Sequence, residues 1–286
     1  MGLPMAANLL AAGYELVVYN RTAAKADPLV ANGAHRADRP ADVAQPGGIV
    51  VSMLADDAAV ESLVTGDEGI AKRLAPAGIH VSMSTVSPAA TRKLAAYHAS
   101  ANSVMVASPV FGRPDAAKAK QLRICVSGAS EAKAKVRPIL EAMGQGIFDF
   151  GDHPDAANVV KLAGNFMIAA AMEAMAEALA MVRKSGVDPI ATIEMLTSTI
   201  FAAPVYQGYG AAIARERFTP AGFRLPLGLK DIDLVLKTAS EARAPMPTAS
   251  LLHDRFIAAL AKGRAEMDWS ALALGAFDDA GLKETR

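Results

Sequence analysis

The chain of 286 residues carries 29 Lys and Arg against 29 Asp and Glu, so its formal net charge is zero. Nucleic-acid binders usually carry a basic excess, and we therefore expect no nucleic-acid partner. Hydrophobic residues make up 52% and charged residues 20%, the balance of a globular protein rather than a disordered one. The length predicts two domains.

The cysteine and the histidines indicate the compartment and whether a metal site is present. The single cysteine, Cys125, cannot form an internal disulfide, which favours a reducing compartment, so we expect a cytoplasmic protein. The five histidines are scattered without ligand spacing, and no metal site is predicted. We expect neither a signal peptide nor a membrane span. The apolar stretch 162–182 is long enough to cross a bilayer, but Asn165, Glu173 and Glu177 interrupt it, which favours a buried helix of a soluble protein.

In the first part of the chain, short runs rich in Val and Ile alternate with Ala-rich segments of helical spacing. The strand-like runs lie at 15–19, 49–54, 79–83, 104–107, 122–126 and 147–150, and the helical segments at 23–31, 58–63, 88–99 and 131–143. This alternation predicts βαβ units and a mainly parallel sheet that is covered on both faces. We therefore predict an α/β, Rossmann-type doubly wound domain over residues 1–153.

The strand signal then stops. Residues 154–184 read as one long helix, apolar nearly all round, that must be covered on every side. Asp188 as N-cap and Pro189 at the first helical position predict the start of the next helix. Further helical segments lie at 190–197, 228–242, 248–262 and 270–274. We predict an all-helical C-terminal domain over residues 154–286, for substrate binding and oligomerisation, joined to the first domain by the long interdomain helix.

The start of the chain matches the end of a dinucleotide-binding turn. Such a turn reads G-x-G-x-x-G between a first strand and a helix, and only its last glycine, Gly2, is present here. We expect Met1 to be an internal methionine, preceded in the native protein by about ten residues that include the central strand of the sheet. Without that central strand the hydrophobic core of the domain would be open. The loss of an edge strand would only shorten the sheet.

Several longer motifs occur in a specific order and spacing: Gly2-Leu3-Pro4-Met5-Ala6-Ala7-Asn8-Leu9, Asn20-Arg21-Thr22, Met53-Leu54, Ser84-Thr85-Val86-Ser87-Pro88, Pro109-Val110-x-Gly112, Lys161-x-x-x-Asn165 and Lys230-Asp231. Through them essentially the whole chain resembles the β-hydroxyacid dehydrogenase family, which includes 3-hydroxyisobutyrate dehydrogenase and the glyoxylate and succinic semialdehyde reductases. The resemblance implies hydride transfer between a nicotinamide cofactor and a small aldehyde or keto acid, or the corresponding hydroxyacid. It also implies a homodimer or homotetramer.

The resemblance implies a set of cofactor-binding residues: Gly2, Pro4, Met5, Asn20, Arg21, Thr22, Met53, Leu54, Thr85 and Lys230. The second strand, at 15–19, is followed by no acid until Asp27. A carboxylate there would favour NAD, whereas an arginine accommodates the 2′-phosphate of NADP. We therefore predict that NADP(H) is preferred, with NAD(H) as the alternative cofactor. The other interpretation of Arg21 is a solvated residue in a surface turn.

Lys161 is the predicted catalytic residue. Hydride arrival at a carbonyl carbon leaves negative charge on oxygen, so a proton donor must stand within hydrogen-bond reach. The resemblance implies that Lys161 is this general acid and base, and that Asn165, one helical turn later, supports it. Partial burial would bring its pKa toward the working range. Without the motif, a lysine extending its charged end from an apolar helix would be the better interpretation.

For the substrate, the resemblance implies contacts with Ser84, Phe111, Gly112, Arg113 and Asn165. This chain departs from the family in three places. Ser82 replaces an aspartate before Ser-Thr, Phe111-Gly112-Arg113 replaces Ser-Gly-Gly, and Asp155 and Ala157 replace glycines before the catalytic helix. These differences argue against 3-hydroxyisobutyrate itself as substrate and leave the reaction type unchanged. Arg113 either grips an anion in the pocket or faces solvent.

Two other functions remain as alternatives. The related imine reductases share this architecture and reduce C=N bonds, but they generally carry another residue at the position of Lys161. A catalytically silent dinucleotide-binding module is the second alternative, which the incomplete binding turn keeps open.

Overall fold

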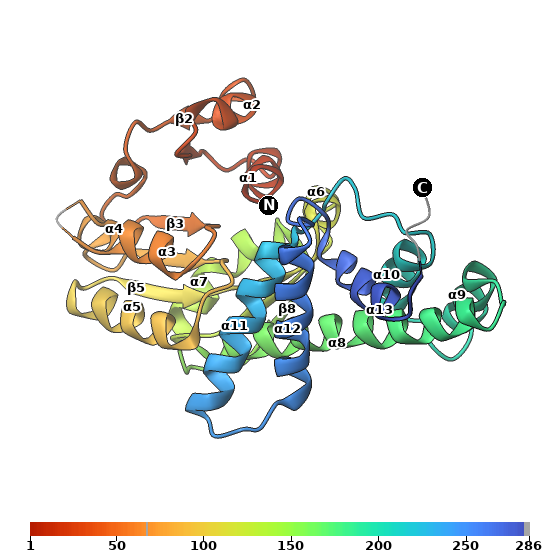
Figure 1. The fold of residues 1–286 in the computed structure, drawn as a ribbon. Coiled ribbons are helices and arrows are strands. Elements are labelled where there is room, and N and C mark those ends of the chain that lie inside the picture. Colours follow the sequence, from red (N-terminus) through yellow and green to blue (C-terminus); the bar gives the residue numbers. More distant parts are fainter. Residues whose placement is uncertain (67, 283–286) are drawn as a thin grey trace. The chain divides into compact units, whose positions relative to one another are not determined.

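The computed structural model describes residues 1–66 and 68–282 and divides into two compact units. Unit 1 comprises Met1–Lys161, and unit 2 begins at Leu162 (Figure 1). This division by packing falls inside the long helix α8, Ala156–Lys184, whereas the predicted domain boundary lies just before that helix.

Unit 1 alternates strands and helices as predicted. Its elements are α1 (Gly2–Ala11), β1 (Val17–Val18), η1 (Ala23–Ala26), α2 (Asp27–Val30), β2 (His35–Arg36), η2 (Pro40–Val43), β3 (Ile49–Ser52), α3 (Asp57–Val64), α4 (Ile70–Leu74), β4 (Ile79–Ser82), α5 (Pro88–Ser100), β5 (Val104–Ala107), β6 (Val110–Phe111), α6 (Pro114–Lys118), β7 (Leu122–Val126), α7 (Ser130–Glu141) and β8 (Gly144–Asp149).

The strands form three small sheets. β1 pairs with β2, and β3, β4 and β5 follow one another, all in parallel. β7 pairs in parallel with β8 and antiparallel with β6, and Ala107 and Ser127 exchange backbone hydrogen bonds that link β5 to the strand-end after β7. β1 and β3, which would flank the central strand of a doubly wound sheet, belong to separate sheets.

The β3–β5 sheet is covered on both faces, as the uninterrupted apolar runs predicted. Side chains alternate along a strand, so Val81 and Met83 point toward α1 and α7 while His80 points toward α5. A second apolar cluster, built around Val60, Ile70 and Leu74 of α3 and α4, covers the face on which α5 lies. The predicted fold class, a Rossmann-type α/β domain, is confirmed.

Unit 2 contains only helices among its described residues. After α8 come α9 (Pro189–Ser198), α10 (Pro204–Ala214), α11 (Leu225–Glu241), α12 (Pro247–Ala261), η3 (Trp269–Ala273) and α13 (Leu274–Asp279). Their shared core is formed by the buried side chains of Met172, Leu179, Ile232, Phe256 and Trp269. α11 approaches α12 closely at Gly228, where an added Cβ would lie 2.7 Å from the Phe256 ring. The predicted all-helical second half is confirmed.

Side-chain caps fix two helix starts, and the predicted start of α9 is confirmed. Ser87 caps α5 by accepting a hydrogen bond from the Ala90 N–H, and Asp188 caps α9 by accepting one from the Ile190 N–H, with Pro189 at the first helical position. Both caps satisfy backbone donors that a helix start leaves without partners.

Several elements lie outside the sequence predictions, among them β2, β6, α4, α6 and α10. Two-residue strands and five-residue helices are too short to show a period. α10 has eleven residues but contains Gly208 and Gly210, which weaken the helical signal. Packing compensates for this, because an added Cβ at Gly210 would lie 2.7 Å from Ile193 of α9.

Helix α8 has 29 residues and is long and apolar enough to cross a membrane by length and composition. Two of its buried polar residues, however, have partners within unit 2. Asn165 is hydrogen-bonded to Asp231, and Glu173 to Arg255. Such pairing is what a helix in the core of a folded unit requires. Coverage is incomplete within one chain, since Met167 is 68% and Met181 66% exposed.

Candidate active site

The first turn of α8 is anchored to unit 1 by the residues that replace the family's glycines. Asp155, 7% exposed, forms an ion pair with Arg92 of α5. The Ala157 N–H donates a 3.0 Å hydrogen bond to the Ser127 hydroxyl, and its methyl group packs with Cys125. Both departures therefore fix the base of the helix that carries Lys161.

Lys161 lies in the second turn of α8 and is only 8% exposed. Its Nζ lies 4.1 Å from the centroid of the Phe111 ring, which belongs to β6. Cys125 of β7 is close enough to respond to this charge. Burial raises the pKa of the Cys125 thiol, and the positive charge of Lys161 opposes that rise. The structure thus places a buried ammonium group against an aromatic face.

Two predicted site residues form a hydrogen bond between the carboxyl end of β3 and that of β4. The hydroxyl of Ser84, which is fully buried, accepts a 2.8 Å hydrogen bond from the Leu54 N–H. Gly2 lies against Met53, where an added Cβ would be 3.8 Å from that of the methionine. Helix α1 begins at Gly2 without a side-chain cap. Uncapped N–H groups beside the ends of parallel strands fit the pyrophosphate of a dinucleotide.

The other predicted cofactor residues have different surroundings. Asn20, Arg21 and Thr22 are exposed in the loop after β1, where the Asn20 amide donates a 2.8 Å hydrogen bond to the Thr22 carbonyl. Met5 is 2% exposed in the core of unit 1, so only its backbone is available to a ligand. Pro4 lines a hollow of about 670 Å³ bounded by α1, α2 and α6.

The segment that replaces Ser-Gly-Gly has a clear backbone requirement. Gly112 has φ +139°, and an added Cβ would lie 2.6 Å from the Leu122 side chain, so only glycine fits. Arg113 is exposed at the start of α6, and Thr85 is half-buried directly after Ser84. Of this segment, only Phe111 is brought against Lys161 by an aromatic contact.

In unit 2, three polar side chains are connected around Asp231 of α11. Asn165 donates a 2.5 Å hydrogen bond from its amide to Asp231 Oδ2, and the Lys230 ammonium lies 3.0 Å from Asp231 Oδ1. Asp231 is 1% exposed and Asn165 5%. Asp231 belongs to the Lys230-Asp231 motif, but no role was predicted for it. Its position was a signal, because it shares the buried face of α11 with Gly228, Ile232 and Val235.

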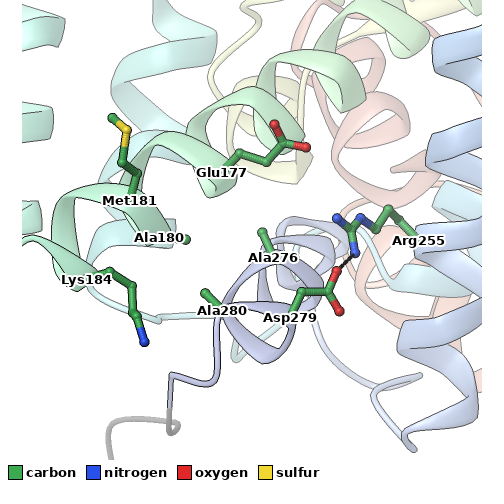
Figure 2. Close-up of a pocket in the computed structure, with 8 residues that line it drawn as sticks. All are labelled: Glu177, Ala180, Met181, Lys184, Arg255, Ala276, Asp279 and Ala280. Carbon is green, nitrogen blue, oxygen red and sulfur yellow. Dashed lines mark hydrogen bonds and ion pairs between the residues drawn. The ribbon is translucent and has the colours of Figure 1, made fainter.

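A hollow of about 370 Å³ in unit 2 is shown in Figure 2. Its described lining includes no predicted site residue, and its charges balance one another. Arg255 pairs with Asp279 there and also donates a 2.7 Å hydrogen bond to Glu173. We therefore take as candidate site residues those around Lys161 and the ends of β3 and β4 in unit 1, and separately the Asn165–Asp231 pair in unit 2, rather than this hollow.

Comparisons with known proteins identify the family of this chain. Residues 1–151 match the family model for the NAD binding domain of 6-phosphogluconate dehydrogenase. Residues 155–274 match the model described as NAD-binding of NADP-dependent 3-hydroxyisobutyrate dehydrogenase. An uncharacterized oxidoreductase from Bacillus subtilis, YfjR, is 44% identical over 272 residues, 95% of each chain.

Two further proteins have assigned functions. The 3-hydroxyisobutyrate dehydrogenase of Pseudomonas aeruginosa is 34% identical over 262 residues, covering 90% of this chain and 88% of the relative. The solved 3-hydroxyisobutyrate dehydrogenase of Mycobacterium tuberculosis with L-serine superimposes with a TM-score of 0.85 at 26% identity, over 96% of this chain and 94% of that one. The chain is a member of the β-hydroxyacid dehydrogenase family of NAD(P)-dependent oxidoreductases.

Proposed function

We propose that this protein transfers a hydride between NADPH and a small aldehyde or keto acid, or runs the reverse oxidation of the hydroxyacid, with Lys161 as general acid and base. The observation that carries the proposal is the burial of Lys161 at 8% exposure with its ammonium against the Phe111 ring. The lysine stands at the motif position of the family, and burial limits its exchange with bulk water.

When bound, the reduced nicotinamide supplies the hydride. As negative charge develops on the carbonyl oxygen, the Lys161 ammonium donates a proton to that oxygen, and in the reverse direction the neutral amine accepts the proton of the hydroxyl. Asn165 binds the substrate with an amide whose orientation is set by its 2.5 Å hydrogen bond to Asp231. Within unit 1, Ser84 and the backbone around Gly112 are the proposed substrate contacts.

The preference for NADPH is supported by Arg21 and Thr22. Both are exposed directly after β1, where they can reach a 2′-phosphate, and no carboxylate stands at that position to repel one. Gly2 and the neighbouring Met53-Leu54 segment would hold the pyrophosphate and ribose. Arg21→Ala should lower kcat/KM for NADPH and leave that for NADH nearly unchanged. An equal loss with both cofactors would contradict the proposed role.

The substrate class is inferred from the named relatives. 3-Hydroxyisobutyrate and L-serine, the compounds in their names, both carry a hydroxyl on the carbon β to a carboxylate. We propose short β-hydroxyacids and their semialdehydes for this chain. Phe111 lacks the hydroxyl that the family's serine offers to a substrate carboxylate, so 3-hydroxyisobutyrate is expected to be a poorer substrate than in those relatives.

A panel of substrates tests the proposal. Purified protein is assayed for NADPH consumption with glyoxylate, succinic semialdehyde and short semialdehydes, and for reduction of NADP⁺ with L-serine and 3-hydroxyisobutyrate. NADH and NAD⁺ run in parallel. Turnover of any carbonyl that is lost in Lys161→Met supports the proposal. Turnover of a cyclic imine alone would favour C=N reduction, and cofactor binding without any turnover would favour a silent binding module.

We also propose an oligomeric state and a cellular location for this protein. A homodimer or homotetramer is supported by the apolar side chains that one chain leaves exposed in unit 2, among them Met167, Met181 and Ile200, the last 78% exposed. Light scattering on the purified protein tests this, and a monomer at micromolar concentration would contradict it. A cytoplasmic location is supported by Cys125, which is free and buried.

A further inference from the structure

Phe111 lies in β6, where two features constrain it. Its backbone pairs with Arg123 of β7, and Gly112 directly after it has no room for a side chain. Phe111 also packs against a small buried cluster of Ala107, Cys125 and Ala157, the last in the first turn of α8. Its side chain therefore lies against both the sheet and the start of the helix that carries Lys161.

The Lys161 ammonium lies 4.1 Å from the centroid of this ring. A cation within about 6 Å of an aromatic face is attracted by the electron density of that face, and the attraction grows when water is excluded. Lys161 is 8% exposed, so the interaction is largely desolvated. The ring attracts the cation through the π electrons of its face. It offers no lone pair that could accept a hydrogen bond from the ammonium.

We propose that Phe111 is a positioning residue that holds the Lys161 ammonium in place, in its protonated form, for proton donation to the substrate. This inference rests on the proposed function of Lys161. The alternative is that the ring only covers the methylene groups of the lysine, as any apolar side chain of that size would do.

Substitutions separate the two interpretations. Phe111→Leu keeps an apolar side chain and removes the aromatic face. Phe111→Tyr keeps the face, and fluorinated phenylalanines keep the shape while progressively weakening the negative potential of the face. Carbonyl reduction requires the protonated lysine, so kcat/KM falls as the pH rises through the pKa of Lys161.

Removing an interaction that favours the cation lowers that pKa. In Phe111→Leu the fall in kcat/KM should therefore move to lower pH by roughly half to one and a half units, with an activity loss on the order of three- to thirtyfold above the midpoint. Phe111→Tyr should retain the wild-type profile, and the fluorinated series should shift stepwise. A Phe111→Leu profile that coincides with the wild type, in a protein with native circular dichroism, would overturn the proposal.

Cys125 of β7 is a titratable group whose pKa responds to the charge of Lys161: burial raises the pKa of the thiol, and the lysine charge opposes that rise. Cys125→Ala is the matched control. If the falling limb of the profile persists in this variant, the limb belongs to the lysine. If it disappears, the profile reports the thiol and the proposal is contradicted.

A readout without turnover distinguishes failure of this inference from failure of the proposed function. The rate at which acetic anhydride modifies Lys161 is measured against pH by peptide mass spectrometry, with the exposed Lys237 as internal reference. Phe111→Leu should raise the relative rate for Lys161 at neutral pH, because more of the amine is neutral. Such a rise in a protein that turns over no substrate would contradict the proposed function alone. Unchanged labelling in an active enzyme would contradict the role of Phe111 alone.

Discussion

Unit 1 buries two lysines to the same extent and surrounds them differently. Lys133 of α7 and Lys161 of α8 are both 8% exposed. The Lys133 ammonium lies 2.7 Å from an Asp149 oxygen and 3.1 Å from an Asp152 oxygen, and it also donates to the Gly151 carbonyl. The Lys161 ammonium lies over the Phe111 ring.

The groups around each ammonium determine how strongly the lysine holds its proton. Burial acts to lower the pKa of Lys133, but its hydrogen bonds to Asp149 and Asp152 outweigh this, and the net pKa is raised. Carboxylates occupy the N–H donors and hold the proton, so Lys133 fastens α7 to the loop after β8. A ring attracts the charge without accepting the proton. The contacts of these two equally buried lysines therefore differ, because carboxylates surround the Lys133 ammonium and an aromatic ring lies against that of Lys161.

The largest expected effect is on catalysis. Lys161→Met should lower kcat by about a hundredfold to ten-thousandfold, because the positioned proton donor is lost. NADPH binding, followed by its fluorescence, should be nearly unchanged. Lys133→Met is the matched control, with the same substitution at a lysine of equal burial, and it should retain most of the activity. Similar losses of kcat in both variants would remove the distinction between them.

The second-largest effect is expected on stability and concerns two buried histidines that folding keeps neutral. His80 and His98, both fully buried, are hydrogen-bonded to each other at 3.1 Å and at their far nitrogens to Ser52 and Ser103 at 2.8 Å. Burial lowers the pKa of His98 from 6.5 to about 4, and burial together with the charge of His98 lowers that of His80.

Because folding holds these imidazoles neutral, their contribution is present above the unfolded pKa of 6.5 and is lost as the pH falls toward the folded pKa of about 4. His98 alone should cost about 2 kcal/mol in the free energy of unfolding between neutral pH and about pH 5. Urea unfolding across this range measures it, and His98→Gln should flatten the dependence. A pH-independent unfolding free energy would show that the two histidines titrate normally.

A smaller effect is expected on stability in Lys133→Met. The free energy of unfolding should fall by about 1 kcal/mol, since its partners Asp149 and Asp152 are 55% and 71% exposed and can return to water. Added salt should reduce the difference from the wild type. An increase in stability would mean that Lys133 is better replaced by an apolar side chain, as some buried charges are.

The smallest effect is expected for Asp152→Asn. This substitution removes one of the two carboxylates beside Lys133 and leaves the 2.7 Å contact with Asp149 in place. The unfolding free energy should change by about 0.5 kcal/mol or less, measured in urea. A loss as large as that of Lys133→Met would show that Asp152, rather than Asp149, holds the ammonium.

Much of the architecture could be predicted from local pattern. Apolar runs predicted β5 and β7 with their observed bounds, and cap residues predicted the start of α9. Two-residue strands such as β6 have no period of their own, and they exist only because a neighbouring strand supplies hydrogen bonds. They could not be predicted for that reason.

The candidate site divides in the same way. Motif order along the chain was sufficient to single out Lys161, Asn165 and the Ser84-Thr85 pair. The partners of these residues depend on folding, because Phe111 reaches Lys161 only when β6 and α8 pack together, and Asp231 reaches Asn165 only when α11 packs on α8. Residue types and spacing encode which chemistry is available, whereas desolvation and contact between distant segments arise only in three dimensions, as they do around the two equally buried lysines, Lys133 and Lys161.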